Sequence, residues 1–361
     1  MVDKRNVQKV VDEFNKRHGA GVAIQLSEQR NPETVSTGVP MLDYALGGGW
    51  GKNTQNLVWG SFSTGKSVLS IQTIVALQHS DPDALACIVD IENTTRDEWL
   101  EKLGVDTSRV VILRPVTAED ALTQTMYVFT MNVFSVIVFD SLGALAKQRD
   151  VYGKDGKGAK GEEASYGGSS MIITRLANDI LACEKELEIR HTTGEDVILP
   201  VVLYIGQVRD NVDSMYVAFK LSGGNAIKHA MSSIVYLAPN TGNDNKIMGE
   251  VGGVKMQIGK KITARVEKNK EDAPGRMAGF DLIYLANDHR AVGVARERSL
   301  YDLAVFLGVI DVRGAWNYYR EGEEGAIKSQ GADNTVELLR NNVEFFDAVK
   351  TDIDVIRAKE K

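Results

Sequence analysis

The feature that most constrains this chain is the segment Gly60-Ser-Phe-Ser-Thr-Gly65-Lys66-Ser67. It directly follows the apolar run 55–59 and directly precedes a helix-like run at 68–77. A glycine-rich turn between a strand and a helix lets consecutive backbone amides point at phosphate oxygens, and the helix adds its positive dipole end. The motif therefore predicts a phosphate-binding loop, made of Gly60, Ser61, Phe62, Ser63, Thr64, Gly65, Lys66, Ser67 and Val68. In such a loop Lys66 reaches the outer phosphates and the Ser67 hydroxyl holds Mg²⁺.

The overall composition is that of an ordinary globular protein. The chain has 361 residues, of which 43% are hydrophobic, so it is long enough for two or three domains and a large core. The 42 Lys and Arg against 49 Asp and Glu give a net charge of −7, which excludes a generally basic nucleic-acid coat. Any contact with DNA must therefore come from local patches.

Cysteine usage and hydropathy exclude other classes. The two cysteines, Cys87 and Cys183, are too few for a zinc set or a disulfide framework. The N-terminus is charged and lacks an apolar signal region, and the longest apolar stretch, 197–206, is too short to span a bilayer. We therefore expect a cytoplasmic protein.

From residue 55 onward, short apolar strands alternate with helices. This rhythm is typical of an α/β fold with a mostly parallel central sheet that is covered on both faces. In such sheets ligands bind at the carboxyl ends of the strands, where the phosphate-binding loop is also expected. The expected strands are 85–91, 110–113, 135–140, 201–206 and 233–237, and the expected helices include 96–103 and 118–131.

The N-terminal region has a different pattern. Val7, Val10, Val11 and Phe14 fall at helical spacing, and residues 22–26 look like a lone strand. A helix and one strand make a poor domain by themselves. The strand either joins the main sheet or pairs with another chain, in which case the segment is a polymerisation arm.

Acidic residues follow two of the expected strands. Asp140 ends a run of four apolar residues, as does the carboxylate that holds the Mg²⁺ water shell in ATPases of this kind. Asp90 and Glu92 end another strand and, being two apart, share one side of an extended chain. Either could orient and deprotonate an attacking water, and we favour Glu92 because it lies closer to the edge of the sheet.

The order and spacing of short motifs over essentially the whole chain resemble those of the bacterial and phage RecA recombinases. Eight matches in register are far more specific than any single one. They are Glu33-Thr-Val-Ser-Thr-Gly38, Leu42-Asp43-Tyr-Ala-Leu-Gly47, Lys102-Leu-Gly-Val-Asp106, Asp140-Ser141, Ile205-Gly-Gln207-Val-Arg209, Gly223-Gly-Asn225-Ala-Ile-Lys228, Lys268-Asn269-Lys270 and Gly314-Ala-Trp316.

The resemblance implies ATP and Mg²⁺ as cofactors and assigns roles at the nucleotide site. By this resemblance the phosphate and Mg²⁺ ligands are Lys66, Ser67 and Asp140. The hydrolytic base is Glu92, and the sensor of the γ-phosphate is Gln207. Lys268 and Lys270 match two lysines that reach into the ATP site of a neighbouring subunit. Trp99 and Tyr284 fall where the family has residues near the adenine and the nucleotide, although each could equally belong to the core. Arg96 stands where the resemblance leads us to expect an acidic contact to adenine.

The resemblance also implies DNA-binding segments near residues 147–170 and 208–225. In the second segment Val212 looks like an apolar wedge between base triplets, with Arg209, Gly223, Gly224 and Asn225 along the DNA backbone. The first is a basic, glycine-rich stretch, and Arg175 on the following helix is the favoured phosphate contact. The cluster Lys255, Lys260, Lys261 and Arg265 falls where relatives hold a second DNA molecule, and Lys261 and Arg265 are its candidate contacts.

Three regions follow from this interpretation: an N-terminal polymerisation arm over 1–33, a RecA-like ATPase core over 34–287, and a small α/β C-terminal domain over 288–361 that captures duplex DNA. The implied function is an ATP-dependent homologous recombinase that forms helical filaments on single-stranded DNA and exchanges strands with duplex DNA. DNA would stimulate its ATP hydrolysis, and single-strand-binding and mediator proteins are further candidate partners. The alternatives are a ring-forming DNA helicase on the same core, or a mediator that uses ATP only as a switch.

We expect Lys66→Ala to abolish strand exchange, because this substitution removes the cation that reaches the outer phosphates. A strand-exchange gel run beside an assay of DNA-dependent ATP hydrolysis measures both effects. Intact strand exchange in the variant, or wild-type ATP hydrolysis that is indifferent to single-stranded DNA, would contradict the assignment.

Overall fold

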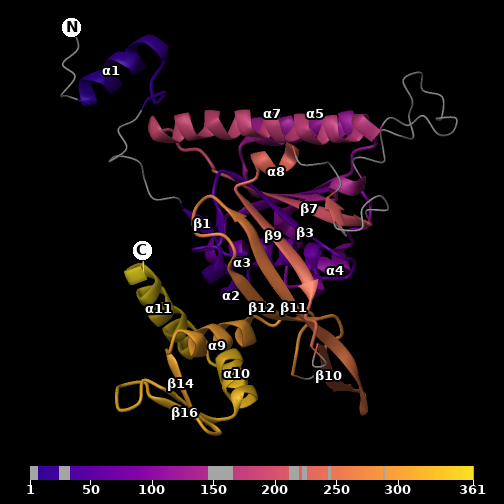
Figure 1. Ribbon diagram of the computed structural model, residues 1–361, viewed down its shortest axis with the longest axis vertical. Helices are drawn as coiled ribbons and strands as arrows, with labels where there is room; N and C mark the ends of the chain where they lie inside the picture. The colour runs from indigo at the N-terminus through magenta and orange to yellow at the C-terminus, as the bar shows by residue number, and fades with distance from the viewer. Residues whose placement is uncertain are drawn as a thin grey trace, which may run out of the picture.

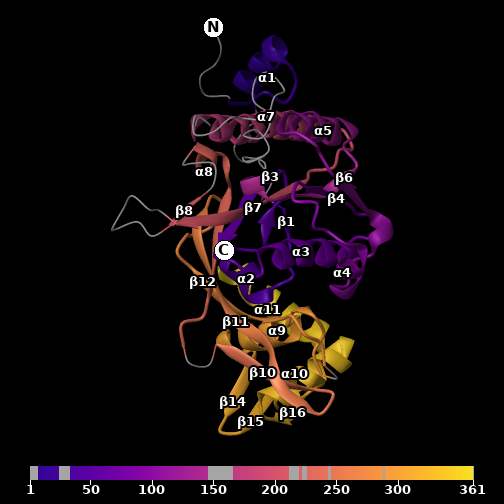
Figure 2. The ribbon, with the colours of Figure 1, turned by 90° about the vertical axis from the view of Figure 1, so that its right-hand side faces the viewer.

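The computed structural model describes residues 7–23, 33–144, 166–210, 219–221, 226–242, 245–287 and 289–360. It confirms the predicted α/β architecture with a large, mostly parallel central sheet (Figure 1). A smaller unit with its own three-stranded sheet follows toward the C-terminus, at the end of the molecule opposite to α7 (Figures 1 and 2).

The central sheet has the strand order β13-β12-β11-β9-β3-β7-β6-β4-β5. From β9 to β5 all neighbours are parallel, whereas β11, β12 and β13 pair antiparallel. The strands are β3 (Thr54–Gly60), β4 (Leu85–Asp90), β5 (Val110–Leu113), β6 (Phe134–Asp140), β7 (Val201–Asp210), β9 (Ser233–Pro239), β11 (Val254–Asn269), β12 (Met277–Ile283) and β13 (Gly293–Val294). Two further strands, β8 (Phe219–Leu221) and β10 (Lys246–Val251), pair with β7 and β11.

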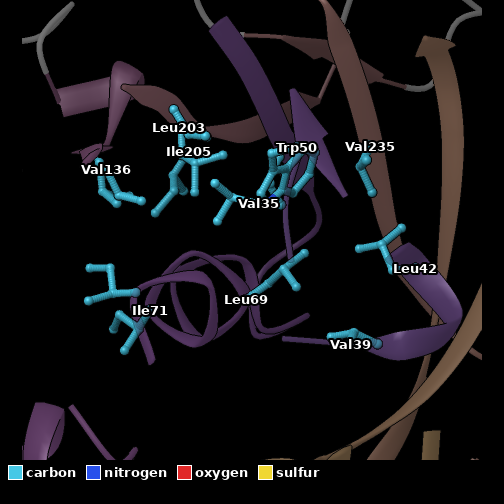
Figure 3. Close-up of a cluster of buried hydrophobic side chains, with 14 of the residues drawn as sticks. Val35, Val39, Leu42, Trp50, Leu69, Ile71, Val136, Leu203, Ile205 and Val235 are labelled. Carbon is cyan, nitrogen blue, oxygen red and sulfur yellow. The ribbon is translucent and has the colours of Figure 1, made fainter. Parts of the chain in front are cut away.

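Helices cover both faces of this sheet. One face packs on α2 (Pro40–Ala45), α3 (Lys66–Ser80) and α4 (Asp97–Lys102), and the other on α5 (Ala118–Met131), α7 (Tyr166–Thr192) and α8 (Ala226–Ala230). Successive side chains of a strand point to opposite faces, so continuous apolar strands supply both cores. On β6, for example, Val136 belongs to the first core and Ile137 to the second. Figure 3 shows the first core, in which Leu69 of α3 lies beneath Leu203, Ile205 and Val235 of the sheet.

The C-terminal unit has a separate core. It is built from α9 (Arg296–Phe306), β14 (Ile310–Arg313), β15 (Trp316–Tyr319), β16 (Ile327–Gln330), α10 (Ala332–Asn341) and α11 (Val343–Glu360). It meets the central unit through α2, where the amide of Met41 donates a hydrogen bond of 3.1 Å to the Ser299 hydroxyl of α9. A two-stranded sheet of β1 (Thr34–Val35) and β2 (Trp50–Gly51) flanks α2, and residues 107–109 form a 3₁₀ turn.

The N-terminal segment contains the expected helix, α1 (Val7–His18). Its neighbour Ala23 exchanges two hydrogen bonds of 2.8 Å with the Asn15 side chain, which folds residues 19–23 back on the helix. Most of the strand predicted over 22–26 lies outside the described residues, so its partner stays a prediction.

The asparagine and glycine residues within 239–253 predict a hairpin, and the hairpin that forms is longer than this stretch. Its two strands are β10 and β11, which meet at Gly252 and Gly253, both with positive φ. The asparagine-rich stretch before β10 is the connection from β9 instead. The sequence indicated the turn, but the tertiary pairing decided how far the second strand extends.

A buried polar cluster joins α7 to the sheet. Glu184 is 6% exposed, and one of its carboxyl oxygens accepts a hydrogen bond of 3.2 Å from the Gln55 side chain. The other oxygen, Oε1, has no hydrogen-bond partner. The side-chain oxygen Oε1 of Gln55 in turn accepts a hydrogen bond of 2.9 Å from the Tyr204 hydroxyl. Burial raises the pKa of Glu184 to about 8, although Gln55 and the charge of Lys270 oppose the shift.

We expect this carboxyl to make the protein less stable as pH rises. Its pKa is higher in the folded chain than its ordinary value of 4.5, so the folded state holds the proton more tightly and loses this advantage between about pH 4.5 and about pH 8. Glu184→Gln should therefore be more stable than the wild type at about pH 9, by an amount on the order of a few kcal/mol, and similar to it at about pH 4, where the carboxyl is protonated in both the folded and the unfolded chain.

Urea unfolding followed by circular dichroism at the two pH values measures the difference. Glu188→Gln, one turn further along α7 and exposed, is the matched control. Equal losses of stability with pH in the wild type and Glu184→Gln would show that Glu184 is already ionised in the folded protein.

Candidate functional site

The predicted phosphate-binding loop joins β3 to α3, as the sequence indicates. β3 ends at Gly60 and α3 begins at Lys66, with Gly65 at φ 84° as its N-cap. A Cβ at Gly60 would lie 2.1 Å from the Leu237 carbonyl oxygen of β9, and one at Gly65 would lie 2.8 Å from the Leu282 side chain of β12. Only glycine fits at either end of the loop, since both positions also have positive φ.

Side chains of the loop hold it in a closed turn. The Lys66 amine donates a hydrogen bond of 2.7 Å to the Ser61 carbonyl oxygen, and the Thr64 hydroxyl donates one of 2.9 Å to the same oxygen. Lys66 is 8% exposed, and burial lowers its pKa, although Asp140 and Glu92 oppose this effect. A buried ammonium that bonds only to a carbonyl is well suited to an anion. Phe62, in contrast, is 73% exposed.

Ser67 and Asp140 lie together, as expected for two groups that hold one cation. The Ser67 hydroxyl donates a hydrogen bond of 2.8 Å to the Asp140 carboxylate at the end of β6. Burial raises the pKa of Asp140 to about 6, and the carboxylates of Glu92 and Asp90 add to the shift. A hydroxyl and a carboxylate are oxygen ligands of the type that Mg²⁺ takes, so these residues fit that ion.

Glu92 contacts Gln207 directly. The Gln207 side-chain amide of β7 donates a hydrogen bond of 3.0 Å to the Glu92 carboxylate, and the Ser141 hydroxyl donates one of 2.6 Å to the same oxygen. Glu92 is exposed at the carboxyl edge of the sheet, whereas Ser141 is fully buried. Sequence reasoning gave Ser141 no role. The signal for it was its place in the Asp140-Ser141 match to the RecA recombinases, which names the residue but not its contact with Glu92.

Asp90, the other carboxylate considered for the base, is in a different environment. It is 1% exposed and accepts hydrogen bonds of 3.1 and 3.0 Å from the backbone amides of Thr94 and Thr95. Its carboxylate also lies 3.6 Å from the guanidinium of Arg114. Asp90 therefore shapes the turn after β4, and Glu92 is the carboxylate that faces the phosphate-binding loop.

The residues predicted near the base of the nucleotide are accessible. Trp99 on α4 and Tyr284 after β12 are 37% and 44% exposed, so neither is a core residue in this chain. The Arg96 guanidinium bonds the carbonyl oxygens of Asn93 and Thr95 in its own loop. It therefore stabilises the entry to α4 in the protein as described.

Lys268 and Lys270 lie at the opposite edge of the sheet from the phosphate-binding loop. Asn269 pairs with Ser233 at the amino end of β9, and the Lys270 amide bonds the Ser232 carbonyl oxygen. The Lys268 amine donates hydrogen bonds of 2.6 and 3.3 Å to the carbonyl oxygens of Lys228 and His229 at the end of α8. The protomer does not bring these lysines to its own loop.

The predicted DNA contacts are only partly described. Val212, Gly223, Gly224 and Asn225, and the basic stretch 147–161, lie outside the described residues. Arg209 is in β7, paired with Lys220 of β8. Arg175 is on α7, 70% exposed, and forms a 3.5 Å ion pair with Asp179.

Lys261 and Arg265 are both exposed on β11. Arg265 is engaged within the protomer, because its guanidinium pairs with Glu267 at 2.6 Å and lies over the Tyr236 ring. Lys261 pairs in the sheet with Asp281 of β12.

Comparison with known proteins agrees with this arrangement. Residues 5–287 match the family model of the RecA N-terminal domain. The chain belongs to the RecA family. Proteins named Protein RecA are similar over nearly the full length: that of Acidothermus cellulolyticus is 28% identical over 97% of this chain and 92% of its own, and that of Rippkaea orientalis 27% identical over 95% and 89%. That of Allorhizobium ampelinum is 28% identical over 97% and 88%.

None of the helices in the described residues is long and apolar enough to cross a membrane. No cluster of three or more His, Cys, Asp or Glu side chains in the same residues is arranged to hold a metal ion. This finding does not conflict with the Ser67 and Asp140 pair, because Mg²⁺ in nucleotide sites takes few protein ligands and completes its shell with phosphate and water.

We expect Mg²⁺-dependent nucleotide binding to weaken as pH falls through the pKa of Asp140, about 6. The protonated carboxyl is a poor cation ligand, so affinity should fall about tenfold between about pH 7.5 and about pH 5. Titration of a fluorescent nucleotide at both pH values measures it. In Asp140→Asn the nucleotide can still be protonated, but residue 140 has no carboxyl to protonate. The nucleotide affinity of this variant should therefore fall less between the two pH values. An identical fall in both proteins would exclude Asp140 as the titrating group.

Proposed function

We propose that this RecA-family protein is an ATP-dependent homologous recombinase. It polymerises on single-stranded DNA, stretches the strand, tests duplex DNA by base pairing and exchanges strands. Hydrolysis of ATP, stimulated by DNA, then releases or recycles the filament.

The observation that carries this proposal is the hydrogen bond between Gln207 and Glu92. Gln207 lies in β7, two residues before Arg209, where the predicted second DNA-binding segment begins. Glu92 lies near Asp140, whose pKa its charge raises, and Asp140 accepts the hydrogen bond from Ser67. One contact therefore links the group that faces the γ-phosphate to the strand that leads into the DNA-binding segment.

The residues of the site have complementary tasks in hydrolysis. Lys66 neutralises negative charge on the outer phosphates. Glu92 orients the attacking water and accepts a proton from it. Ser67 and Asp140 would hold Mg²⁺, which would offset the negative charge that develops on the phosphate oxygens. The Gln207 amide occupies one Glu92 oxygen and must move when it contacts a γ-phosphate. DNA binding that shifts β7 would change how freely Glu92 accepts its proton.

The position of Lys268 and Lys270 supports assembly as part of the same function. Both lie at the amino-end edge of the sheet, whereas the phosphate-binding loop lies at the carboxyl-end edge. Subunits stacked with one edge against the other would place these lysines at a neighbour's ATP site. The nucleotide would then be bound between two copies of the chain, which makes ATP binding and filament geometry a single event.

We expect single-stranded DNA to stimulate ATP hydrolysis by the wild-type protein but not by Gln207→Ala, because the variant lacks the contact between the DNA-binding segment and Glu92. The measurement is the release of phosphate with and without single-stranded DNA. Binding of ADP without DNA should be similar in the two proteins, because ADP lacks the γ-phosphate that Gln207 contacts, and this measurement is the control for folding.

Electron microscopy of the wild type with ATP and single-stranded DNA completes the test. Open helical filaments and a positive strand-exchange gel support a recombinase. Discrete hexamers that unwind duplex DNA would indicate a ring-forming helicase. Filaments with slow turnover and no exchange would indicate a mediator that uses ATP as a switch.

A further inference from the structure

Lys260 lies on the face of β11 that covers the phosphate-binding loop. It pairs directly with Leu282 of β12, and directly opposed residues of an antiparallel pair share a face. The Leu282 side chain lies so close to Gly65 that a Cβ on that glycine would be 2.8 Å from it. Further along β11, Ile262 and Ala264 alternate on the same face and join the core of α3. The Lys260 side chain therefore emerges from this core at its edge, next to Gly65.

The position of Lys260 along β11 also places it at the carboxyl-end edge of the parallel strands, where the phosphate-binding loop lies. β9 ends at Pro239, which pairs with Ile262, so Lys260 lies two residues beyond the carboxyl end of β9. The loop begins one residue after Gly60, which pairs with Leu237 of the same strand. Strand β11 thus extends past the parallel strands on the side where the loop lies.

Lys260 and Lys66 form a pair of like charges. The two side chains lie close enough for their positive charges to interact. Lys260 is half-buried, and among the described residues its amine has no carboxylate partner. Two ammonium groups held near one another repel unless an anion lies between them.

We propose that Lys260 is a second phosphate-binding lysine of the nucleotide site, acting within its own subunit beside Lys66. Its ligand is the polyphosphate of the nucleotide, and it makes no contact with the base or the ribose. This inference rests on the proposed function to the extent that the loop binds ATP.

The same strand would then serve two nucleotide sites. Lys268 stands at the other end of β11, about 27 Å away at the usual rise of about 3.4 Å per residue. Lys260 would contact the nucleotide of its own subunit, and Lys268 with Lys270 that of a neighbour. Figure 1 shows β11 running from the core to the β10 hairpin. Lys261 and Arg265 lie on the opposite face of the strand, so the basic cluster of the sequence divides into two surfaces.

The test compares how Lys260→Gln binds ATP, ADP and adenosine without DNA, by isothermal titration calorimetry with Mg²⁺ present. We expect the variant to lose affinity for ATP about tenfold, the effect of one lost charged contact, and to bind adenosine as the wild type does. Lys260→Arg, which keeps the charge, should recover most of the affinity. Lys185→Gln, an exposed lysine on α7 at the other face of the sheet, is the matched control and should bind ATP normally.

Two results would overturn the proposal. In one, Lys260→Gln binds ATP as tightly as the wild type. In the other, it loses the same factor for ATP and adenosine, which would indicate a change of fold around Gly65. If the wild type binds ATP and single-stranded DNA stimulates its hydrolysis while Lys260→Gln is unaffected, only this inference fails. If the wild type does not bind ATP, the proposed function fails with it.

Discussion

The hydrogen-bonded register of the parallel strands is the constraint on which the rest of the site depends. Gly60 of β3 pairs with Gln207 of β7, and Asp90 of β4 pairs with Asp140 of β6. A slip of two residues in either ladder would carry a polar residue about 7 Å from the loop, beyond hydrogen-bond reach. Residues far apart in the chain therefore meet because each pair of strands is hydrogen-bonded in one register. The packing of continuous apolar strands on both faces of the sheet fixes that register.

The site also depends on close approaches that only glycine permits. Gly60 lies against the backbone of β9, and Gly65 against Leu282 of β12. The loop is thus clamped between the parallel strands and the antiparallel extension of the sheet. Movement of β12 would be transmitted to the loop through this direct contact, and movement of β11 through its pairing with β12. This packing gives a physical route by which the subunit contacts that we propose for Lys268 on β11 would affect the nucleotide.

Much of the fold was predictable because its local signals agree with the tertiary structure. The helix 118–131 and the strand 110–113 match the predicted bounds, since a capping box at Thr117 and an uninterrupted apolar run mark them locally. The hairpin of β10 and β11 was predicted too short, because most residues near its turn are exposed and Gly249 and Gly259 interrupt the apolar pattern of its strands. Such strands have weak periodicity, and their extent is set by pairing rather than by burial. The choice between Asp90 and Glu92 also needed the structure, because both lie at one strand end and only the turn that follows separates them.

By itself the sequence determined the phosphate-binding loop, the α/β class and the order of the motifs, because each depends on residues that are adjacent or regularly spaced. The tertiary structure alone decided which side chains meet. It joined Gln207 to Glu92, buried Asp90, placed Lys268 and Lys270 at the far edge of the sheet and separated Lys260 from Lys261 onto opposite faces. The physical reason is that strand pairing and the alternation of side chains across a sheet act between segments distant in the chain, where no local pattern records the partner.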